Sequence, residues 1–278
     1  MAENGQRRKL RVGAAQFDAA AGDFAGNVAA HERLIDEAGE QGVDVVVFPE
    51  LSLPGYAATL LTESPERCVT DPDGPGLDPI RQACRRNNLV AVVGGCLVNG
   101  RGLGLSAMVI DRRDEVCATY VKQHLDGPEK DWFVPGATGC IIDVDGWRLA
   151  LGICYDPSFP EHGRAAVLEG ADAYLVGGAF PLGSSDRRRA IYFPARAPEN
   201  TMYVAFANYV GSHDGLDYGG RSVLYGPDGR MMDEAGENSA GIAMADLDAE
   251  KLQATREALQ MIRDRRAEPP PIQNSVAR

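Results

Sequence analysis

The chain lacks the sequence features of several large protein classes. Its 28 lysine and arginine residues are outnumbered by 40 acidic ones, so the 278 residues carry a formal net charge of −12. This acid excess excludes the basic surface that most nucleic-acid-binding proteins need, and it disfavours docking on an anionic membrane. No apolar run approaches the roughly 18 residues of a membrane span. The polar N-terminal stretch 1–11 is not followed by the apolar segment of a leader, so we expect a cytoplasmic protein.

The motifs of nucleotide, serine-hydrolase and zinc chemistry are also missing. The sequence contains no G-x-S-x-G, no G-x-x-x-x-G-K-[ST], and no G-x-G-x-x-G behind a strand. Its six cysteines form no C-x-x-C pair, and its four histidines form no i, i+4 pair. We therefore predict no metal site. Because no secretory leader is seen, most of the cysteines are expected to be buried, reduced thiols.

Strands and helices alternate in the first and third quarters of the chain. Apolar or β-branched runs predict strands at 9–17, 43–48, 89–98, 105–111, 115–125, 140–144, 147–154, 172–179, 203–210 and 221–225, and helical spacing predicts helices at 27–41, 78–88, 160–169, 185–200 and 249–262. Alternation predicts βαβ units, and the run of strands at 89–154 predicts tight turns, so a mixed-sheet α/β structure follows. We expect one domain at 9–265, a disordered segment at 1–8 and a tail at 266–278.

Three of the predicted strands lead into a residue that can carry chemistry. The run 45–48 leads through a proline to Glu50, the run 119–125 carries Lys122 near its end, and the run 149–153 ends at Cys154. Sites form at the carboxyl ends of strands in open α/β sheets, and a helix that begins soon after a cysteine favours its thiolate. Taken singly, each residue has an ordinary alternative: a solvated loop glutamate, an edge-strand lysine and a buried cysteine.

Taken together, these segments resemble the nitrilase superfamily of carbon–nitrogen hydrolases. The matches are PELSLPGY at 49–56, YVKQHL at 120–125, and GICYD at 152–156 followed by FPE at 159–161. Further matches are EKDWFVPG at 129–136, RAPEN at 196–200, AN at 207–208, GRS at 220–222 and GPDG at 226–229. They occur in the expected order over residues 9–265. This ordered set outweighs the ordinary alternatives for Glu50, Lys122 and Cys154.

The resemblance implies a four-layer αββα sandwich with mixed sheets and a triad of Glu50, Lys122 and Cys154. In the implied mechanism Glu50 takes the proton of the thiol, and Lys122 stabilises the oxyanion together with the backbone N–H of Tyr155. Glu129 would keep Lys122 charged or position the substrate. The residues implied for the substrate pocket are Tyr56, Trp132, Asp156 and Phe180. No metal or organic cofactor is required, and the family implies a homodimer or a higher homo-oligomer that pairs through helices 160–169 and 185–200.

The implied reaction is hydrolysis of a small amide to ammonia and a carboxylic acid through a cysteinyl thioester. An N-carbamoyl amine or amino acid hydrolase is the first alternative, because a ureido carbonyl is the same electrophile. A nitrilase is a further one, although nitrile-cleaving members tend to carry Trp-Glu where Tyr155 and Asp156 stand. The last alternative is a non-catalytic interaction protein of the same fold, which the intact triad argues against.

The charge of the distal end of the substrate is a separate question. Relatives often carry arginine where this chain has Ser158, so one candidate clamp for a carboxylate is missing. The net charge and the acidic segment 129–131 also favour encounter with cations. Residues 187–189, three consecutive arginines, could line the other side, but a charge run at the start of a helix is usually solvated. On these grounds we predict a neutral or cationic distal end.

Overall fold

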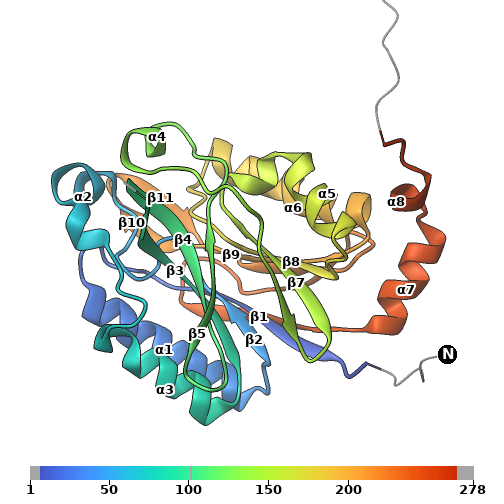
Figure 1. Cartoon of the computed structure of the whole chain (residues 1–278), viewed down its shortest axis with the longest axis horizontal. Helices are drawn as coiled ribbons and strands as arrows, with labels where there is room; N and C mark the ends of the chain where they lie inside the picture. The colour runs from blue at the N-terminus through green and yellow to red at the C-terminus, as the bar shows by residue number, and fades with distance from the viewer. Residues whose placement is uncertain (1–6, 101, 268–278) are drawn as a thin grey trace, which may run out of the picture.

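Two six-stranded mixed sheets pack face to face in the computed structural model, which describes residues 7–100 and 102–267 (Figure 1). The first sheet consists, in spatial order, of β14 (Gly241–Leu247), β1 (Leu10–Gln16), β2 (Val45–Val47), β3 (Val90–Asn99), β4 (Gly102–Ile110) and β5 (Val116–Val121). The second consists of β13 (Met231–Glu234), β12 (Val223–Tyr225), β9 (Tyr203–Ala207), β8 (Ala173–Gly177), β7 (Trp147–Ile153) and β6 (Ile141–Val144). A hairpin of β10 (Val210–His213) and β11 (Leu216–Gly219) stands apart from both.

The two sheets have the same internal pattern. Strands β1, β2 and β3 are parallel, as are β7, β8 and β9, and every other neighbouring pair is antiparallel. Parallel neighbours need a crossover connection, and helices supply most of the crossovers here. The predicted α/β fold with mixed sheets is confirmed.

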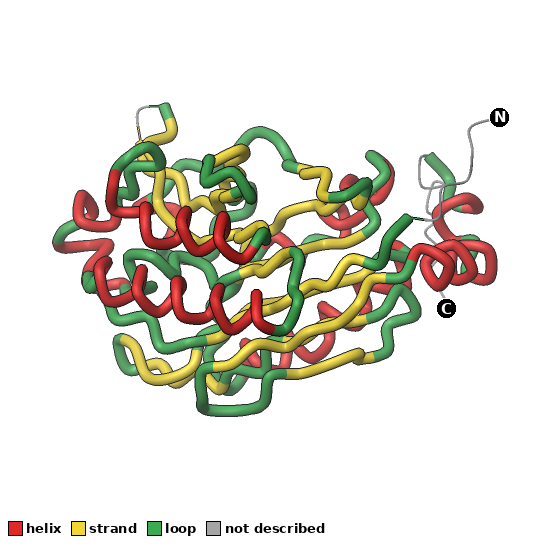
Figure 2. Tube along the Cα trace, turned by 90° about the horizontal axis from the view of Figure 1, so that it is seen from below, coloured by secondary structure: helices red, strands yellow, loops and turns green. Residues whose placement is uncertain are grey.

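Helices cover the outer face of each sheet. α1 (Phe24–Glu40) and α3 (Asp78–Asn87) run side by side over the first sheet, and α5 (Pro160–Leu168) and α6 (Ser184–Asn200) lie over the second (Figures 1 and 2). The other helices are α2 (Ala58–Glu63), α4 (Glu129–Trp132), α7 (Ala249–Ala258) and α8 (Met261–Asp264), with short 3₁₀ turns at Pro65–Cys68, Pro75–Leu77 and Asp156–Ser158. No helix in the described ranges combines the length and apolarity of a membrane span.

Three hydrophobic clusters separate these layers. The largest lies between the sheets and includes Val12, Val47, Leu149 and Leu175. A second joins α1 and α3 to the first sheet, and a third joins α5 and α6 to the second. Alternate residues of one strand therefore serve different clusters, since successive side chains point to opposite faces of the sheet. This layering is the αββα sandwich.

Several predicted elements differ in detail. The hairpin predicted at 140–154 is present as β6 and β7, but the strand predicted at 203–210 stops at Ala207. There the side chain of Asn208 accepts a hydrogen bond from the backbone N–H of Phe180 (2.9 Å), which ties the chain to the loop after β8. The helix predicted at 249–262 is two helices, with non-helical backbone at Leu259. The edge strands β13 and β14 were not predicted; in β14 glycine and alanine have low strand propensity.

The predicted terminal segments lie partly outside the described residues. Positions 1–6 and 268–278 are not described, whereas Arg7 and Arg8 of the predicted disordered segment form ion pairs. Arg8 contacts both Asp44 and Asp145, at 2.7 Å each. These contacts hold the chain at the start of β1.

Candidate active site

The three predicted catalytic residues follow strands β2, β5 and β7. Strand β5 runs in the same direction as β2, because two antiparallel steps separate it from β3. Glu50 and Lys122 therefore leave the same edge of the first sheet, and Cys154 leaves the second sheet directly after β7. The side chains of Glu50 and Lys122 are completely buried.

The backbone before Glu50 passes very close to both sheets. A Cβ atom on Gly94 would lie 2.2 Å from the carbonyl oxygen of Pro49, and one on Gly177 would lie 2.5 Å from that of Phe48. Both positions need glycine for this close approach. The Tyr209 hydroxyl also donates to the carbonyl of Glu50 (2.7 Å), which fixes the segment from a third side.

Lys122 is the centre of the buried charge cluster. Its Nζ donates to Oε1 of Glu50 at 2.6 Å and to Oε1 and Oε2 of Glu129 at 2.8 and 2.7 Å. Glu129 in turn accepts from the Tyr56 hydroxyl (3.0 Å) and from the backbone N–H of Asp126 (2.8 Å). These contacts fix the ammonium in one position, as a preorganised electrostatic group requires.

Burial and charge set the protonation states in this cluster. Desolvation raises the pKa of Glu50 to about 7, against the lowering effect of Lys122. Burial alone would lower the pKa of Lys122, but the charges of Glu50 and Glu129, and the hydrogen bond to Glu129, raise it. Burial and then the Glu50 carboxylate raise the pKa of the Cys154 thiol. The resting state is therefore a neutral thiol beside a base that titrates near neutrality and a permanently charged lysine.

Cys154 stands in a strained turn between β7 and the helical segment that follows. Its φ of +42° lies in the left-handed region, which costs a non-glycine residue about 1–3 kcal/mol. Its backbone N–H donates to the carbonyl of Gly177 (2.9 Å), and the N–H of Ile153 donates to Oδ2 of Asp156 (3.0 Å). These bonds hold the turn, so the thiol has a defined direction at the strand end.

Asp156 supports this turn. It does not line the pocket, which is where the sequence predicts it. Its carboxylate is fully buried and accepts from the Tyr120 hydroxyl (2.7 Å) and from the backbone N–H of His124 (2.9 Å). Burial alone would raise the pKa of Asp156, but a hydrogen bond with the His124 ring (2.9 Å), the charge of His162 and the Tyr120 hydroxyl lower it. Trp132, the other misplaced pocket residue, packs half-buried against the core between the sheets.

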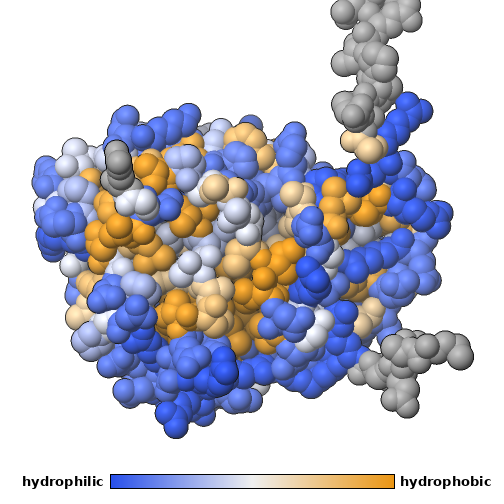
Figure 3. All heavy atoms as spheres, in the orientation of Figure 1, coloured by the Kyte–Doolittle hydropathy of each residue, from blue (hydrophilic) through white to orange (hydrophobic). Residues whose placement is uncertain are grey.

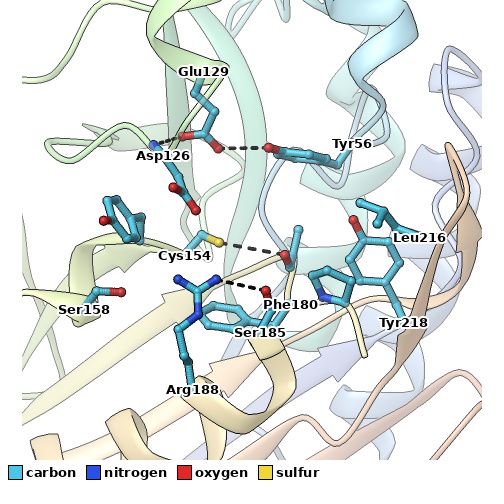
Figure 4. A pocket seen from close by; sticks show the side chains of 13 residues that line it. Tyr56, Asp126, Glu129, Cys154, Ser158, Phe180, Ser185, Arg188, Leu216 and Tyr218 are labelled. Atoms are coloured by element: carbon cyan, nitrogen blue, oxygen red, sulfur yellow. Dashed lines mark hydrogen bonds between the residues drawn. The ribbon is translucent and has the colours of Figure 1, made fainter. Parts of the chain in front are cut away.

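The thiol opens into a small cavity (Figure 4). Its volume is about 160 Å³. Tyr56 and Phe180, the remaining predicted pocket residues, lie in its wall. The other lining residues are Asp126, Glu129, Cys154, Tyr155, Ser158, Ala179, Pro181, Ser185, Arg188, Leu216 and Tyr218.

Sequence reasoning missed much of this wall. Leu216 and Tyr218 come from β11, whose hairpin could have been found from the Asp214–Gly215 turn signal. The expectation that the arginine run is a solvated face is wrong for two of its three members. Arg188 lines the cavity, and Arg189 is buried against Asp186 (2.9 Å).

A cysteine, a glutamate and a lysine at the strand ends of an αββα sandwich define a hydrolase class with a thiol nucleophile. Over the described parts of the chain, no three histidine, cysteine or acidic side chains are grouped to hold a metal ion. A model of the carbon–nitrogen hydrolase family matches residues 11–257, and the chain belongs to this family, the nitrilase superfamily of carbon–nitrogen hydrolases.

Characterised relatives share most of their length with this chain. It is 31% identical to a nitrilase of Pyrococcus abyssi over 80% of this chain and 83% of that one. It is 32% identical to an (R)-stereoselective amidase of a Pseudomonas species, with 80% of each chain covered. A solved structure of the amidase from Nesterenkonia sp. AN1 matches with a TM-score of 0.80 and 30% identity, over 96% of this chain and 97% of that one. That structure has the acetamide moiety of fluoroacetamide attached to its active-site cysteine.

Proposed function

We propose that the protein hydrolyses a small linear amide to ammonia and a carboxylic acid through a thioester on Cys154. One observation carries the proposal: Lys122 is bonded to both Glu50 and Glu129, and Glu129 lines the same cavity as the thiol of Cys154. The relatives that are amidases support the same reaction class.

The proposed reaction has two halves. In the first, the Glu50 carboxylate takes the thiol proton while the sulfur attacks the amide carbonyl carbon, and Lys122 stabilises the negative oxygen that forms. The C–N bond then breaks, Glu50 returns the proton to the leaving nitrogen, and ammonia departs. In the second half, Glu50 takes a proton from water, the resulting hydroxide attacks the thioester, and the C–S bond breaks. The acid leaves, and the sulfur regains its proton. A base with a pKa of about 7 suits both directions of proton transfer.

Glu129 supports the reaction through Lys122. Both of its oxygens accept from Nζ, so the ammonium keeps a carboxylate partner and stays charged when Glu50 becomes protonated during the reaction. The Tyr155 backbone N–H follows the nucleophile and is the second oxyanion donor in this proposal.

The proposal is tested by ammonia release across short amides, carbamoyl compounds and nitriles. Cys154→Ala should lower turnover on the order of 10⁴-fold or more, because removing a nucleophile abolishes the covalent route. Cys117→Ala is the matched control, since that thiol is exposed and lies outside the cavity. In wild-type protein quenched with acid during turnover, mass spectrometry should find an acyl adduct on Cys154. An adduct on one of the five other cysteines, or full activity of Cys154→Ala, would contradict the proposal.

We also propose that the protein is a homodimer that pairs through α5 and α6. Leu168 on α5 and Ile191 on α6 are 43% and 59% exposed, and contiguous exposed apolar surface is typical of an interface. The face seen in Figure 3 also has hydrophobic surface near β5 and β7. Light scattering should give about twice the chain mass of 29.8 kDa; a mass near the monomer at micromolar concentration would contradict this.

We place the protein in the cytoplasm. All six cysteines are free thiols in the structure, and the nucleophile needs a reducing compartment to remain one.

A further inference from the structure

Arg188 brings a positive charge without a carboxylate partner into the wall of the cavity. Its side chain reaches from α6 to the cavity below Cys154, between Ser158 and Ser185 (Figure 4). Within residues 7–100 and 102–267 its one hydrogen bond goes from Nη2 to Oγ of Ser185 (2.9 Å), and it forms no ion pair. A guanidinium has five N–H donors, so most of them are available to a ligand.

The neighbouring arginines differ from Arg188, which lines the cavity and has no carboxylate partner. Arg187 is exposed to solvent, and Arg189 is buried and donates to Asp186 (2.9 Å). Arg221 nearby pairs with Glu237. Arg164 on α5 is likewise half-buried without an acidic partner among the described residues, but it does not line the cavity. Arg188 combines the missing acidic partner with a place in the cavity wall, and there it is available for an anion.

A buried hydroxyl beside the guanidinium also lacks a partner. Oγ of Ser158 is shielded from solvent and has no hydrogen-bond partner among the described residues. Leaving a buried polar atom unpaired is costly, and such an atom in a binding site is commonly satisfied by the ligand. Ser158, Ser185 and Arg188 together offer donors for the two oxygens of a carboxylate, which arginine binds in a bidentate manner.

We propose that Arg188 binds a carboxylate at the distal end of the substrate, so that the protein acts on short ω-carboxy amides. This inference rests on the proposed function, and it reverses the neutral or cationic distal end expected from the sequence. The net charge of −12 is spread over the surface, where charges more than about 8–10 Å apart are screened. Lys122 pairs with Glu129 at 2.7 Å and with Glu50 at 2.6 Å, so this cluster has a net charge of −1 when Glu50 is ionised and of zero when Glu50 is protonated.

Asp126 is the acidic group that opposes this selection. Its side chain also faces the cavity, on the other side of Cys154 from Arg188, and the two do not pair (Figure 4). A cationic substrate would use Asp126 and leave both Arg188 and Ser158 unsatisfied. A carboxylate satisfies both, and the small volume of the cavity keeps the distal group of a short amide within reach of α6.

The test compares three amides of equal length by steady-state ammonia release: succinamate, pentanamide and 4-aminobutanamide. We expect kcat/KM to be highest for succinamate. Arg188→Gln should lower the ratio of kcat/KM for succinamate to that for pentanamide by on the order of 10- to 100-fold, the value of hydrogen bonds to a charged group. Arg187→Gln removes the same charge one residue away on an exposed position, and it should leave the ratio unchanged.

A binding measurement separates this inference from the proposed function. Succinate, the product of succinamate hydrolysis, should slow alkylation of Cys154 by iodoacetamide in the wild type and not in Arg188→Gln. Protection by succinate without turnover of any amide would overturn the proposed function and leave the carboxylate site standing. A preference for 4-aminobutanamide, or an equal effect of the Arg187 and Arg188 substitutions on the ratio, would overturn the inference while amide hydrolysis stands.

Discussion

The two ends of the cavity differ in how their charges are satisfied. At the reaction end, Lys122 is fully buried and contacts three carboxylate oxygens of Glu50 and Glu129. At the distal end, Arg188 is half-buried and forms no ion pair within the described residues. Asp126, on the other side of Cys154, is also half-buried and without an ion pair there. The ammonium of the reaction end is fully paired in the free protein, although Oε2 of Glu50 has no hydrogen-bond partner among the described residues. The guanidinium of the distal end, in contrast, is paired only when a ligand binds.

This difference follows from what each end must do. A reacting group has to be held in place before substrate arrives, because reorganisation during the reaction would cost catalysis. A specificity group gains most when its donors are vacant until the right ligand fills them, since a ligand without the matching group leaves them unpaired. The reaction end therefore determines the reaction class, and the distal end determines which substrate is used.

The largest effect is expected from substituting Lys122, the centre of the reaction end. Lys122→Ala should lower kcat on the order of 10²-fold or more, as does the loss of an oxyanion donor. It should also destabilise the fold by about 3–5 kcal/mol, because two buried carboxylates lose their partner. Lys122→Arg should not restore activity, since the planar guanidinium does not fit the position of a compact ammonium.

Ammonia release and thermal unfolding, measured on the same preparations, separate these two effects. Circular dichroism shows which variants are folded before their rates are compared. Full activity in either variant would mean that Lys122 is only an edge-strand charge.

A smaller effect is expected from pH. Glu50 acts as a base only when ionised, and its pKa is raised to about 7 by burial. The value of kcat/KM should therefore rise as pH increases through neutrality. Glu129 contributes to raising the pKa of Glu50 by repulsion, so Glu129→Gln should move the rising limb to lower pH. A profile that is flat across neutral pH, or a limb that moves upward, would show that Glu50 is not the titrating base.

The reaction end could be predicted from the sequence because its residues lie in short ordered motifs. Lys122 and Cys154 directly follow strands whose apolar pattern is clear, and Glu50 follows another strand after two further residues. Sites form at such strand ends in open α/β sheets. The strands β13 and β14 lacked such a pattern and were missed. The role of Asp156 was also missed, because its partners Tyr120 and His124 are more than thirty residues away in the chain.

The distal end could not be predicted from the sequence, because the rotation of α6 about its axis determines which arginine faces the cavity. Arg187, Arg188 and Arg189 are identical in sequence terms, yet about 100° of rotation separates each from the next on α6. Only the packing of α6 on the second sheet determines that the middle one faces the cavity. Ser158, which stands where relatives often carry arginine, indicated that one positive charge is missing from the pocket. It did not indicate that Arg188 supplies another.

The smallest expected effect concerns the acidic half of the distal end. If Arg188 selects a carboxylate, the Asp126 carboxylate across the cavity repels the same group, and Asp126→Asn should raise kcat/KM for succinamate. Because Asp126 is half-exposed, the gain should be about 1.5- to 5-fold, the worth of roughly 0.2–1 kcal/mol for a solvated charge pair. The backbone N–H of residue 126 still donates to Glu129 in this variant, so the reaction end is unchanged.

Asp131→Asn is the matched control, because Asp131 is an exposed acid on the same segment and lies outside the cavity lining. In Asp131→Asn, kcat/KM for succinamate should equal that of the wild type within experimental error. The increase in Asp126→Asn should become smaller as salt is added. For 4-aminobutanamide, kcat/KM should fall in Asp126→Asn. The variant removes a carboxylate that attracts the cationic end of this substrate and that, unlike Glu129, has no lysine partner. An equal gain in both variants would assign the effect to net charge rather than to the cavity. A lower kcat/KM for succinamate in Asp126→Asn, but not in Asp131→Asn, would mean that Asp126 supports the reaction end. Asp126 would then belong with Lys122 and Glu129 and would play no part in the selection of the distal group.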